Sequence, residues 1–194
     1  MQINSIVEKY SILLGSKSPR RQDLLQQAAI PFRLVNCEVD EIYPAHLQAQ
    51  EIPCYLSELK AKAYQPSLKE NELLITADTI VWLDGKVLGK PQSQEDATQM
   101  LQQLSGKCHT VYTGFTISSK DKSVTDSEHT KVFFRELSTQ EIEYYVHTYR
   151  PMDKAGSYGV QEWIGMVGVT HIQGCYYNIM GLPVQKVYQN LLHF

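Results

Sequence analysis

Residues 12–21 read ILLGSKSPRR, and this stretch predicts a buried strand, a tight turn and the start of a helix. The run 12–15 is short and apolar, as buried strands are. Ser18 suits the N-cap position of a helix, and Pro19 then falls at the first helical position, where its missing N–H costs nothing. The helix is expected to end before Pro31.

Arg20 and Arg21 fall in the first turn of this helix, where the helix dipole disfavours cations. A local conflict of this kind is typical of a functional site. Backbone N–H groups, the hydroxyls of Ser16 and Ser18 and two guanidiniums would together attract an anion such as a phosphate chain. The alternative is that the arginines point into solvent or pair with carboxylates elsewhere. On the anion-site interpretation, Arg21→Ala should stabilise the unliganded protein by roughly 0.3–1 kcal/mol.

Composition sets the broad class of the protein. A chain of 194 residues suits one large domain or two small lobes, and we expect a single domain over 1–194 with two lobes and no independent linker. The net charge of −3 gives no reason to expect a nucleic-acid or membrane-surface partner. Residues 1–10 are too polar for a signal peptide, and no apolar run could span a bilayer. The cysteines are scattered without a CxxC motif, which indicates reduced thiols in a cytoplasmic protein.

Helical and strand-like patterns alternate along the rest of the chain. Asp84-Gly85 predicts a tight hairpin, so a purely parallel sheet is excluded. The fold class is therefore α/β, with a mixed twisted sheet flanked by helices. Strands are expected at 32–35, 73–77, 80–83, 86–88, 109–118, 130–135 and 163–172. Further helices are expected at 52–64, from Ser93 to a stop at Gly106, from Ser138 to before Pro151, and at 184–192.

Asp78 follows the buried run 73–77, and we expect it at the C-terminal end of that strand, where open α/β sheets build ligand sites. With the acidic cluster Glu38, Asp40 and Glu41 it could hold a divalent cation or take a proton from water. The alternative is an aspartate that caps the strand end through its own backbone.

Lys60 and Lys90 are candidate phosphate clamps, although from pattern alone a single lysine is more often a solvated surface charge. The loop 154–159 carries two glycines and is expected to turn tightly or to approach a ligand, unless it is an ordinary connection. Several cations, several carboxylates and no obvious nucleophile suit metal-assisted attack of water on a polyphosphate.

In order and spacing, these motifs resemble those of the Maf family, the house-cleaning nucleoside triphosphate pyrophosphatases once called septum formation inhibitors. The resemblance covers nearly the whole chain from Ser11 onward. It rests on Ser16-x-Ser18-Pro19-Arg20-Arg21, Val39-Asp40-Glu41, Lys60-Ala61, Ala77-Asp78-Thr79, Gly89-Lys90-Pro91, Ser105-Gly106, Thr113-Gly114, the segment Lys154 to Gln161, and Asn178-x-x-Gly181-Leu182-Pro183.

The resemblance implies the fold of the inosine triphosphate pyrophosphatases, with a mixed sheet, two lobes and a central cleft. It also implies hydrolysis of a nucleoside triphosphate to the monophosphate and pyrophosphate with Mg²⁺ or Mn²⁺. By position, Asp78 resembles the proton acceptor, and Glu41 and Asp78 the metal or water ligands. The positions that resemble phosphate contacts are Ser16, Ser18, Arg21, Lys60 and Lys90, and those that resemble base-preference positions are Arg20, Thr79 and Gln161.

Arg, Thr and Gln at these three base-preference positions are typical of the branch that prefers dTTP and UTP, whereas the 7-methyl-GTP branch carries Trp, Gln and Glu. Lys62 competes with Lys60 for the aligned role. Gly15 stands where the family usually has Ala, which at a tight turn is expected to be harmless. The competing function is a nucleotide-binding regulator that inhibits septum formation, and it would need the arginines but not Asp78. A homodimer is an open alternative, since family members are often dimeric.

Overall fold

The structure is a computed structural model of the chain, and it describes residues 3–194. The helices are α1 (Ile3–Lys9), α2 (Pro19–Gln27), α3 (Glu51–Tyr64), α4 (Gln94–Leu104), α5 (Thr139–Tyr149), α6 (Trp163–Gly168), α7 (Tyr176–Ile179) and α8 (Val184–Leu191), with short 3₁₀ turns η1 (Gln65–Ser67) and η2 (Ala155–Ser157). The strands are β1 (Ser11–Leu14), β2 (Arg33–Leu34), β3 (Glu72–Leu83), β4 (Lys86–Leu88), β5 (Cys108–Ser118), β6 (Ser123–Phe134) and β7 (Val169–Gln173).

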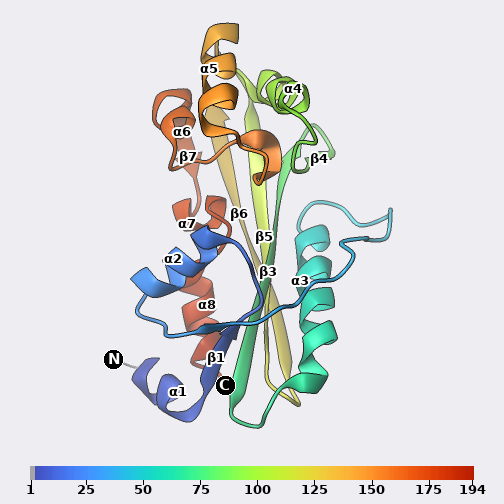
Figure 1. Cartoon of the computed structure of the whole chain (residues 1–194), viewed down its shortest axis with the longest axis vertical. Helices are drawn as coiled ribbons and strands as arrows, with labels where there is room; N and C mark the ends of the chain where they lie inside the picture. Colours follow the sequence, from blue (N-terminus) through green and yellow to red (C-terminus); the bar gives the residue numbers. More distant parts are fainter. Residues whose placement is uncertain (1–2) are drawn as a thin grey trace. The chain divides into compact units, whose positions relative to one another are not determined.

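Within the described residues, seven strands form one sheet in the order β2-β1-β3-β5-β6-β7, and β4 pairs with β3 (Figure 1). β1 is parallel to β2 and β3, whereas β4 is antiparallel to β3 and β7 is antiparallel to β6. The Asp84-Gly85 hairpin forms as predicted, with positive φ angles of 50° and 80°. The predicted mixed sheet is therefore confirmed.

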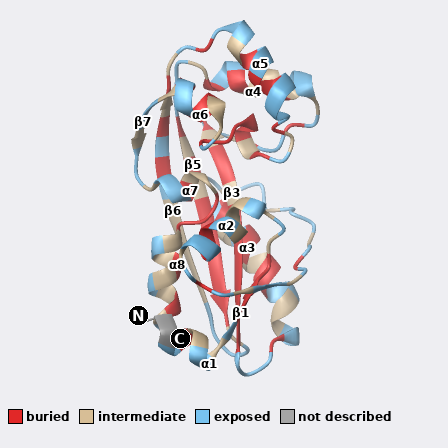
Figure 2. Cartoon of the chain, turned by 60° about the vertical axis from the view of Figure 1, so that its left-hand side comes forward, coloured by how far each residue is buried: buried red, intermediate tan, exposed pale blue. Residues whose placement is uncertain are grey.

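The chain divides into two compact units. The first comprises Met1–Asp78, Thr113–Glu128 and Gly181–Phe194, and the second comprises Thr79–Tyr112 and His129–Met180. In the first unit α3 lies on one side of the strands and α2 and α8 lie on the other (Figures 1 and 2). Of the strands between these helices, β1 and β3 are almost wholly buried (Figure 2).

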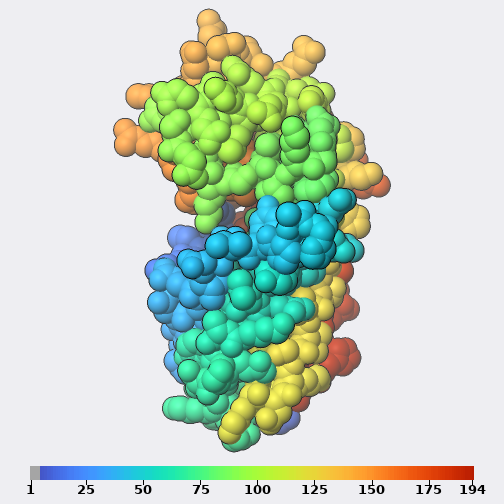
Figure 3. Space-filling view, turned by 90° about the vertical axis from the view of Figure 1, so that its right-hand side faces the viewer, coloured from blue at the N-terminus to red at the C-terminus, as the bar shows by residue number. Residues whose placement is uncertain are grey.

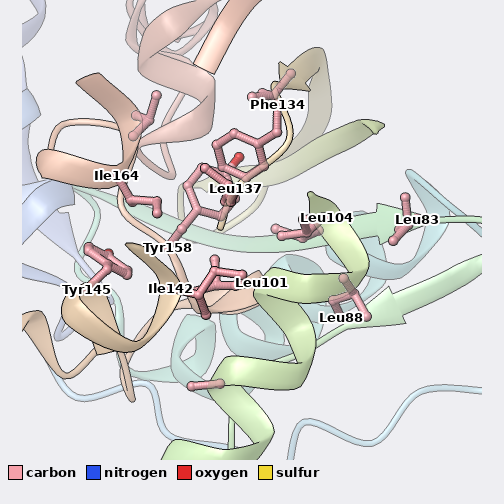
Figure 4. Packing of buried hydrophobic residues seen from close by; sticks show 14 of the residues in the cluster. Leu83, Leu88, Leu101, Leu104, Phe134, Leu137, Ile142, Tyr145, Tyr158 and Ile164 are labelled. Atoms are coloured by element: carbon pink, nitrogen blue, oxygen red, sulfur yellow. The ribbon is translucent and has the colours of Figure 1, made fainter. Parts of the chain in front are cut away.

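The core of the second unit is built where α4 packs against α5 and η2. Its apolar side chains include Leu101, Leu104, Ile142, Tyr145, Tyr158 and Ile164, which Figure 4 shows at close range. The helical spacing of Ile142, Tyr145 and Val146 places all three inward, as predicted, and Ser138 and Glu141 form the predicted capping box at the start of α5.

The prediction of a strand over 163–172 was wrong for its first half, which forms α6 before β7 begins. A short apolar run fits a strand and a buried helix equally well. Packing selects the helix here, because a Cβ on Gly165 would lie 1.9 Å from the carbonyl oxygen of Val160. Only glycine lets this turn of helix approach the preceding loop so closely.

All four cysteines are free thiols. In the part of the chain that the structure describes, no helix is long and apolar enough to cross a membrane.

Candidate functional site

The turn between β1 and α2 is held by Arg21. Ser18 is the N-cap of α2 and Pro19 its first residue, as predicted, although the Ser18 side chain makes no capping hydrogen bond. The Arg21 guanidinium donates from Nη1 to Ser16 Oγ at 3.1 Å and to the carbonyl oxygen of Ala77 at 2.9 Å. Its Nε donates to the carbonyl oxygen of Gly181 at 2.7 Å. Arg21 thus ties the turn to β3 and to the start of the C-terminal segment.

These contacts correct the expected stability effect of removing Arg21. These three acceptors are uncharged oxygens, and two of them are backbone carbonyls. Burial lowers the pKa of the guanidinium, while the nearby charge of Asp78 opposes this shift. Removing Arg21 would leave carbonyl groups without a donor, which costs more than relief of the helix dipole returns. The unliganded protein is therefore expected to lose stability.

Lys60 lies between two carboxylates. Its Nζ is 2.7 Å from Asp78 Oδ1 and 2.7 Å from Glu41 Oε1. Lys60 and Asp78 are both buried, whereas the Glu41 side chain is 48% exposed. Lys62, which competes with Lys60 in the sequence, is exposed and pairs with Glu58 one helical turn away. Of the two lysines, Lys60 is therefore the one that reaches the carboxylates.

Period-two spacing explains how β3 presents Asp78 to α3. Thr76 Oγ1 donates to the carbonyl oxygen of Ser57 at 2.7 Å, and Asp78, two residues on, meets Lys60 one turn further along the helix. Leu74, two residues earlier, packs with Ala61. Alternate residues of a strand share one face, so Leu74, Thr76 and Asp78 all look toward α3.

Asp78 does not sit at the end of its strand, as the sequence suggested, because β3 continues without interruption to Leu83. The apolar residues 80–83 extend the same strand past the carboxylate. The prediction that Asp78 ends a strand was therefore wrong, and strand capping through its own backbone is excluded with it.

The acidic cluster is only partly assembled around Lys60. Glu38 pairs instead with Lys17, an exposed contact, and this hydrogen bond lowers the pKa of Glu38. The loop 36–50 that carries Glu41 lies beside α3 on the surface of the first unit (Figure 3). Glu41, and not Glu38, thus shares Lys60 with Asp78.

Across residues 3–194, no three His, Cys, Asp or Glu side chains gather in a group that could hold a metal ion. Magnesium nevertheless binds in proteins through one or two carboxylates, with water and substrate phosphates completing its shell. Glu41 and Asp78 supply such hard oxygen donors. The donor set therefore fits a divalent cation that arrives with a phosphorylated ligand.

The other predicted site residues are distributed over both units. Ser16, Ser18 and Arg20 belong to the first unit and are partly buried. Thr79, Lys90 and Gln161 belong to the second, where Lys90 and Gln161 are exposed.

Gly15, which stands where the family usually has Ala, is closely packed. A Cβ at this position would lie 2.5 Å from Cys37 Sγ and 3.0 Å from Thr76 Cγ2. Cys37 is buried, and burial raises the pKa of its thiol to about 11, so it behaves as a small apolar side chain. Its sulfur occupies the space that an alanine at position 15 would need.

A buried polar network that sequence reasoning missed lies in the second unit. Lys154 Nζ is 3.2 Å from Glu162 Oε1 and 2.8 Å from Asp153 Oδ1. The other Glu162 oxygen accepts a hydrogen bond from the Tyr145 hydroxyl. The Gly159 amide donates to the same hydroxyl at 3.0 Å. Glycines marked this loop in the sequence, but no local pattern indicated that Tyr145 on α5 would reach it.

Comparison with known proteins assigns the family. Residues 11–194 match the family described as Maf-like protein. The chain therefore belongs to the Maf-like protein family.

Curated relatives match over nearly their whole length. A dTTP/UTP pyrophosphatase from Phocaeicola vulgatus is 52% identical over 95% of this chain and 96% of its own. A dTTP/UTP pyrophosphatase from Parabacteroides distasonis is 51% identical over 97% of this chain and 98% of its own. One from Flavobacterium psychrophilum is 47% identical over 96% of this chain and 95% of its own.

Solved structures are more distant. A dITP/XTP pyrophosphatase from Mycobacterium abscessus is 12% identical, with a TM-score of 0.41 over 66% of this chain and 75% of its own. The Ham1 protein of Staphylococcus aureus is 13% identical, with a TM-score of 0.44 over 64% of this chain and 71% of its own.

Proposed function

We propose that this protein is a nucleoside triphosphate pyrophosphatase that hydrolyses dTTP and UTP to the monophosphate and pyrophosphate. Relatives of about half identity over nearly the full length carry the name dTTP/UTP pyrophosphatase. The observation that carries the proposal is the buried ion pair of Lys60 and Asp78, with Glu41 as the second partner of Lys60. Arg21 holds the turn between β1 and α2 against the Ala77 carbonyl oxygen, next to Asp78 in the chain.

In this proposal the cationic side chains bind phosphate and Asp78 accepts a proton from water. The N-terminus of α2, with Ser16 and Ser18, and the ammonium of Lys60 bind phosphate oxygens, and Lys90 adds a further cation. The Asp78 carboxylate accepts a proton from the attacking water as the bond between the α and β phosphates breaks. A bound Mg²⁺ or Mn²⁺, held by Glu41 and Asp78, would supply charge neutralisation at the phosphates.

Lys60 has two roles in succession under this proposal. Before the nucleotide binds, it neutralises both carboxylates, as its 2.7 Å contacts describe. When a triphosphate binds, the Lys60 ammonium can turn to a phosphate oxygen. The carboxylates of Glu41 and Asp78 would then be available to the cation that accompanies the nucleotide.

Base preference is proposed to depend on Arg20, Thr79 and Gln161. A neutral amide such as Gln161 can donate to and accept from the edge of uracil or thymine. The test compares kcat/KM for dTTP, UTP, CTP and 7-methyl-GTP on the wild type and on Arg20→Trp/Thr79→Gln/Gln161→Glu. A wild type that favours 7-methyl-GTP, or a triple variant with unchanged preference, would refute this assignment.

The decisive experiment is Asp78→Asn, assayed by pyrophosphate release from dTTP with Mg²⁺ or Mn²⁺. A proton acceptor contributes roughly 10²–10⁴ in rate, so the variant should fold normally and lose most activity. Asp84→Asn is the matched control, because Asp84 lies in the hairpin turn, where asparagine is equally well accommodated.

Three results would contradict the proposal: near-wild-type turnover by a stably folded Asp78→Asn, release of orthophosphate in place of pyrophosphate, or full activity in EDTA. The first would show that Asp78 has only a structural role, and a wild type that releases no pyrophosphate would favour a regulator that only binds nucleotide. We place the activity in the cytoplasm, on the basis of the scattered cysteines that suit a reducing compartment.

A further inference from the structure

We propose that Tyr145 is a positioning residue for base recognition, which acts through Glu162 to fix the loop 154–162 that carries Gln161. This inference rests on the proposed function, in which Gln161 contributes to base preference. All of the residues that support it belong to the second unit.

The Tyr145 side chain is fully buried on α5, and its hydroxyl joins two points of the loop. It donates to a Glu162 carboxylate oxygen and accepts from the Gly159 amide at 3.0 Å. Figure 4 shows the Tyr145 ring within the apolar core of this unit. Burial and the Glu162 carboxylate raise the pKa of the phenol, so it remains a protonated donor. The Tyr145 hydroxyl oxygen therefore attaches the loop to α5 at both Gly159 and Glu162.

Lys154 closes the loop from its other end. Its buried ammonium is 3.2 Å from the second Glu162 oxygen, so residues eight positions apart are tied by an ion pair. With Tyr145 on one oxygen and Lys154 on the other, the Glu162 carboxylate is held on both sides. A partly buried carboxylate with charge-assisted contacts at both oxygens has one preferred orientation.

The backbone between these anchors is also constrained. Gly156 and Ser157 adopt left-handed conformations, with φ of 68° and 60°. The Gly156 amide donates to the carbonyl oxygen of Gly89 at 3.0 Å, and a Cβ on Gly156 would lie 2.9 Å from Val81. Left-handed backbone at a non-glycine residue persists where the surroundings determine it. The network and the backbone thus favour a single loop conformation.

Anchoring Glu162 determines where Gln161 points. Gln161 lies in a turn that the Glu162 amide closes by donating to the Gly159 carbonyl oxygen at 3.0 Å, and the Tyr145 hydroxyl contacts both Gly159 and Glu162. Glu162 turns inward to Tyr145, and Gln161 is exposed. A loose Glu162 would therefore let the Gln161 amide adopt several orientations, and a ligand would have to select one of them.

The test is Tyr145→Phe, which keeps the ring and removes only the hydroxyl. A hydrogen bond to a charged group is stronger than one between neutral groups, and loss of even a small part of it changes binding by about threefold. We therefore expect the KM for dTTP to rise about threefold or more, with kcat unchanged within about twofold. Tyr149→Phe is the matched control, because Tyr149 stacks on the Tyr145 ring at 5.0 Å from the same helix.

Inhibition by the two products separates base recognition from phosphate binding. The inhibition constant of dTMP should rise in Tyr145→Phe by the same factor as the KM, whereas that of pyrophosphate should stay unchanged. A parallel rise for pyrophosphate would indicate general loosening and would overturn the inference. So would kinetics equal to those of Tyr149→Phe, or a Gln161→Ala variant that binds dTMP as the wild type does.

A second variant covers the case in which Tyr145→Phe does not fold. Glu162→Gln keeps an acceptor for the Tyr145 hydroxyl but loses the charge that faces Lys154, so the same dTMP-specific loss is expected, and its absence overturns the inference. A wild type that releases no pyrophosphate from dTTP would refute the proposed function itself. A wild type that does so, with unaffected variants, refutes only the role of Tyr145.

Discussion

Acidification is expected to destabilise the protein through His109, a residue of β5 that takes no part in the proposed chemistry. His109 is 2% exposed, and its ring lies against Phe134 and Tyr158 at centroid distances of 5.4 and 5.3 Å. Its Nε2 is 2.7 Å from the Tyr158 hydroxyl, and within residues 3–194 its Nδ1 has no hydrogen-bond partner. A protonated imidazole would place a charge among these rings.

The size of the effect follows from the pKa of the histidine. Burial lowers the pKa of His109 from 6.5 to about 4. Between these values the unfolded chain binds a proton that the folded chain does not, so stability falls as the pH falls. The contribution of the neutral His109 ring to stability is fully present above about pH 6.5. Linkage then gives a loss of about 2 kcal/mol in the free energy of unfolding between about pH 7 and about pH 5.

Urea denaturation at several pH values measures this loss. Over about pH 5–6 the wild type should show a slope approaching about 1.4 kcal/mol per pH unit from this one proton, and His109→Gln should lose that slope. His147→Gln is the control, because His147 is exposed on α5. Hydrogen bonding to Arg135 lowers the pKa of Glu141 to about 2, so that group alters stability only at lower pH. An unchanged slope in His109→Gln would refute the reasoning.

Three further stability predictions follow from the contacts described. Gly15→Ala should cost about 1–3 kcal/mol by crowding Cys37, and Cys37→Ala should recover part of that loss, so that the double-mutant cycle shows a coupling above about 0.5 kcal/mol; additive effects would contradict the steric explanation. Arg21→Ala should lower the stability of the unliganded protein by about 1–3 kcal/mol, and a raised melting temperature would restore the explanation that the helix dipole disfavours a cation at this position. Ser138→Ala should cost about 1 kcal/mol through loss of the α5 capping box, and unchanged stability in urea would show that the cap is dispensable.

Local patterns predicted the elements whose signals lie within a few residues. The N-cap at Ser18, the hairpin at Asp84-Gly85 and the capping box of α5 all formed where their residues indicated. Each depends on the conformation of a few neighbouring residues, which a single sequence records.

Features decided by distant packing were not predictable in this way. The helix at 163–168 depends on Gly165 lying against Val160, and the need for glycine at position 15 depends on Cys37. The hydroxyl of Tyr145 reaches a loop that begins nine residues later in the sequence. The acidic residues of the first unit were recognised, but the sequence did not indicate that Glu41 would share Lys60 while Glu38 would pair with Lys17.

The unbroken course of β3 has a consequence for how this chain can vary in length. Asp78 faces α3 because it lies two positions after Thr76 and four after Leu74, which face the same helix. One residue inserted or deleted between Glu72 and Asp78 would turn the carboxylate to the opposite face of the sheet, whatever residue is involved. Substitutions in β3 alter single contacts, whereas a change of length separates Asp78 from Lys60. Related chains are therefore expected to differ in the side chains of this strand but to keep its count of residues up to the carboxylate.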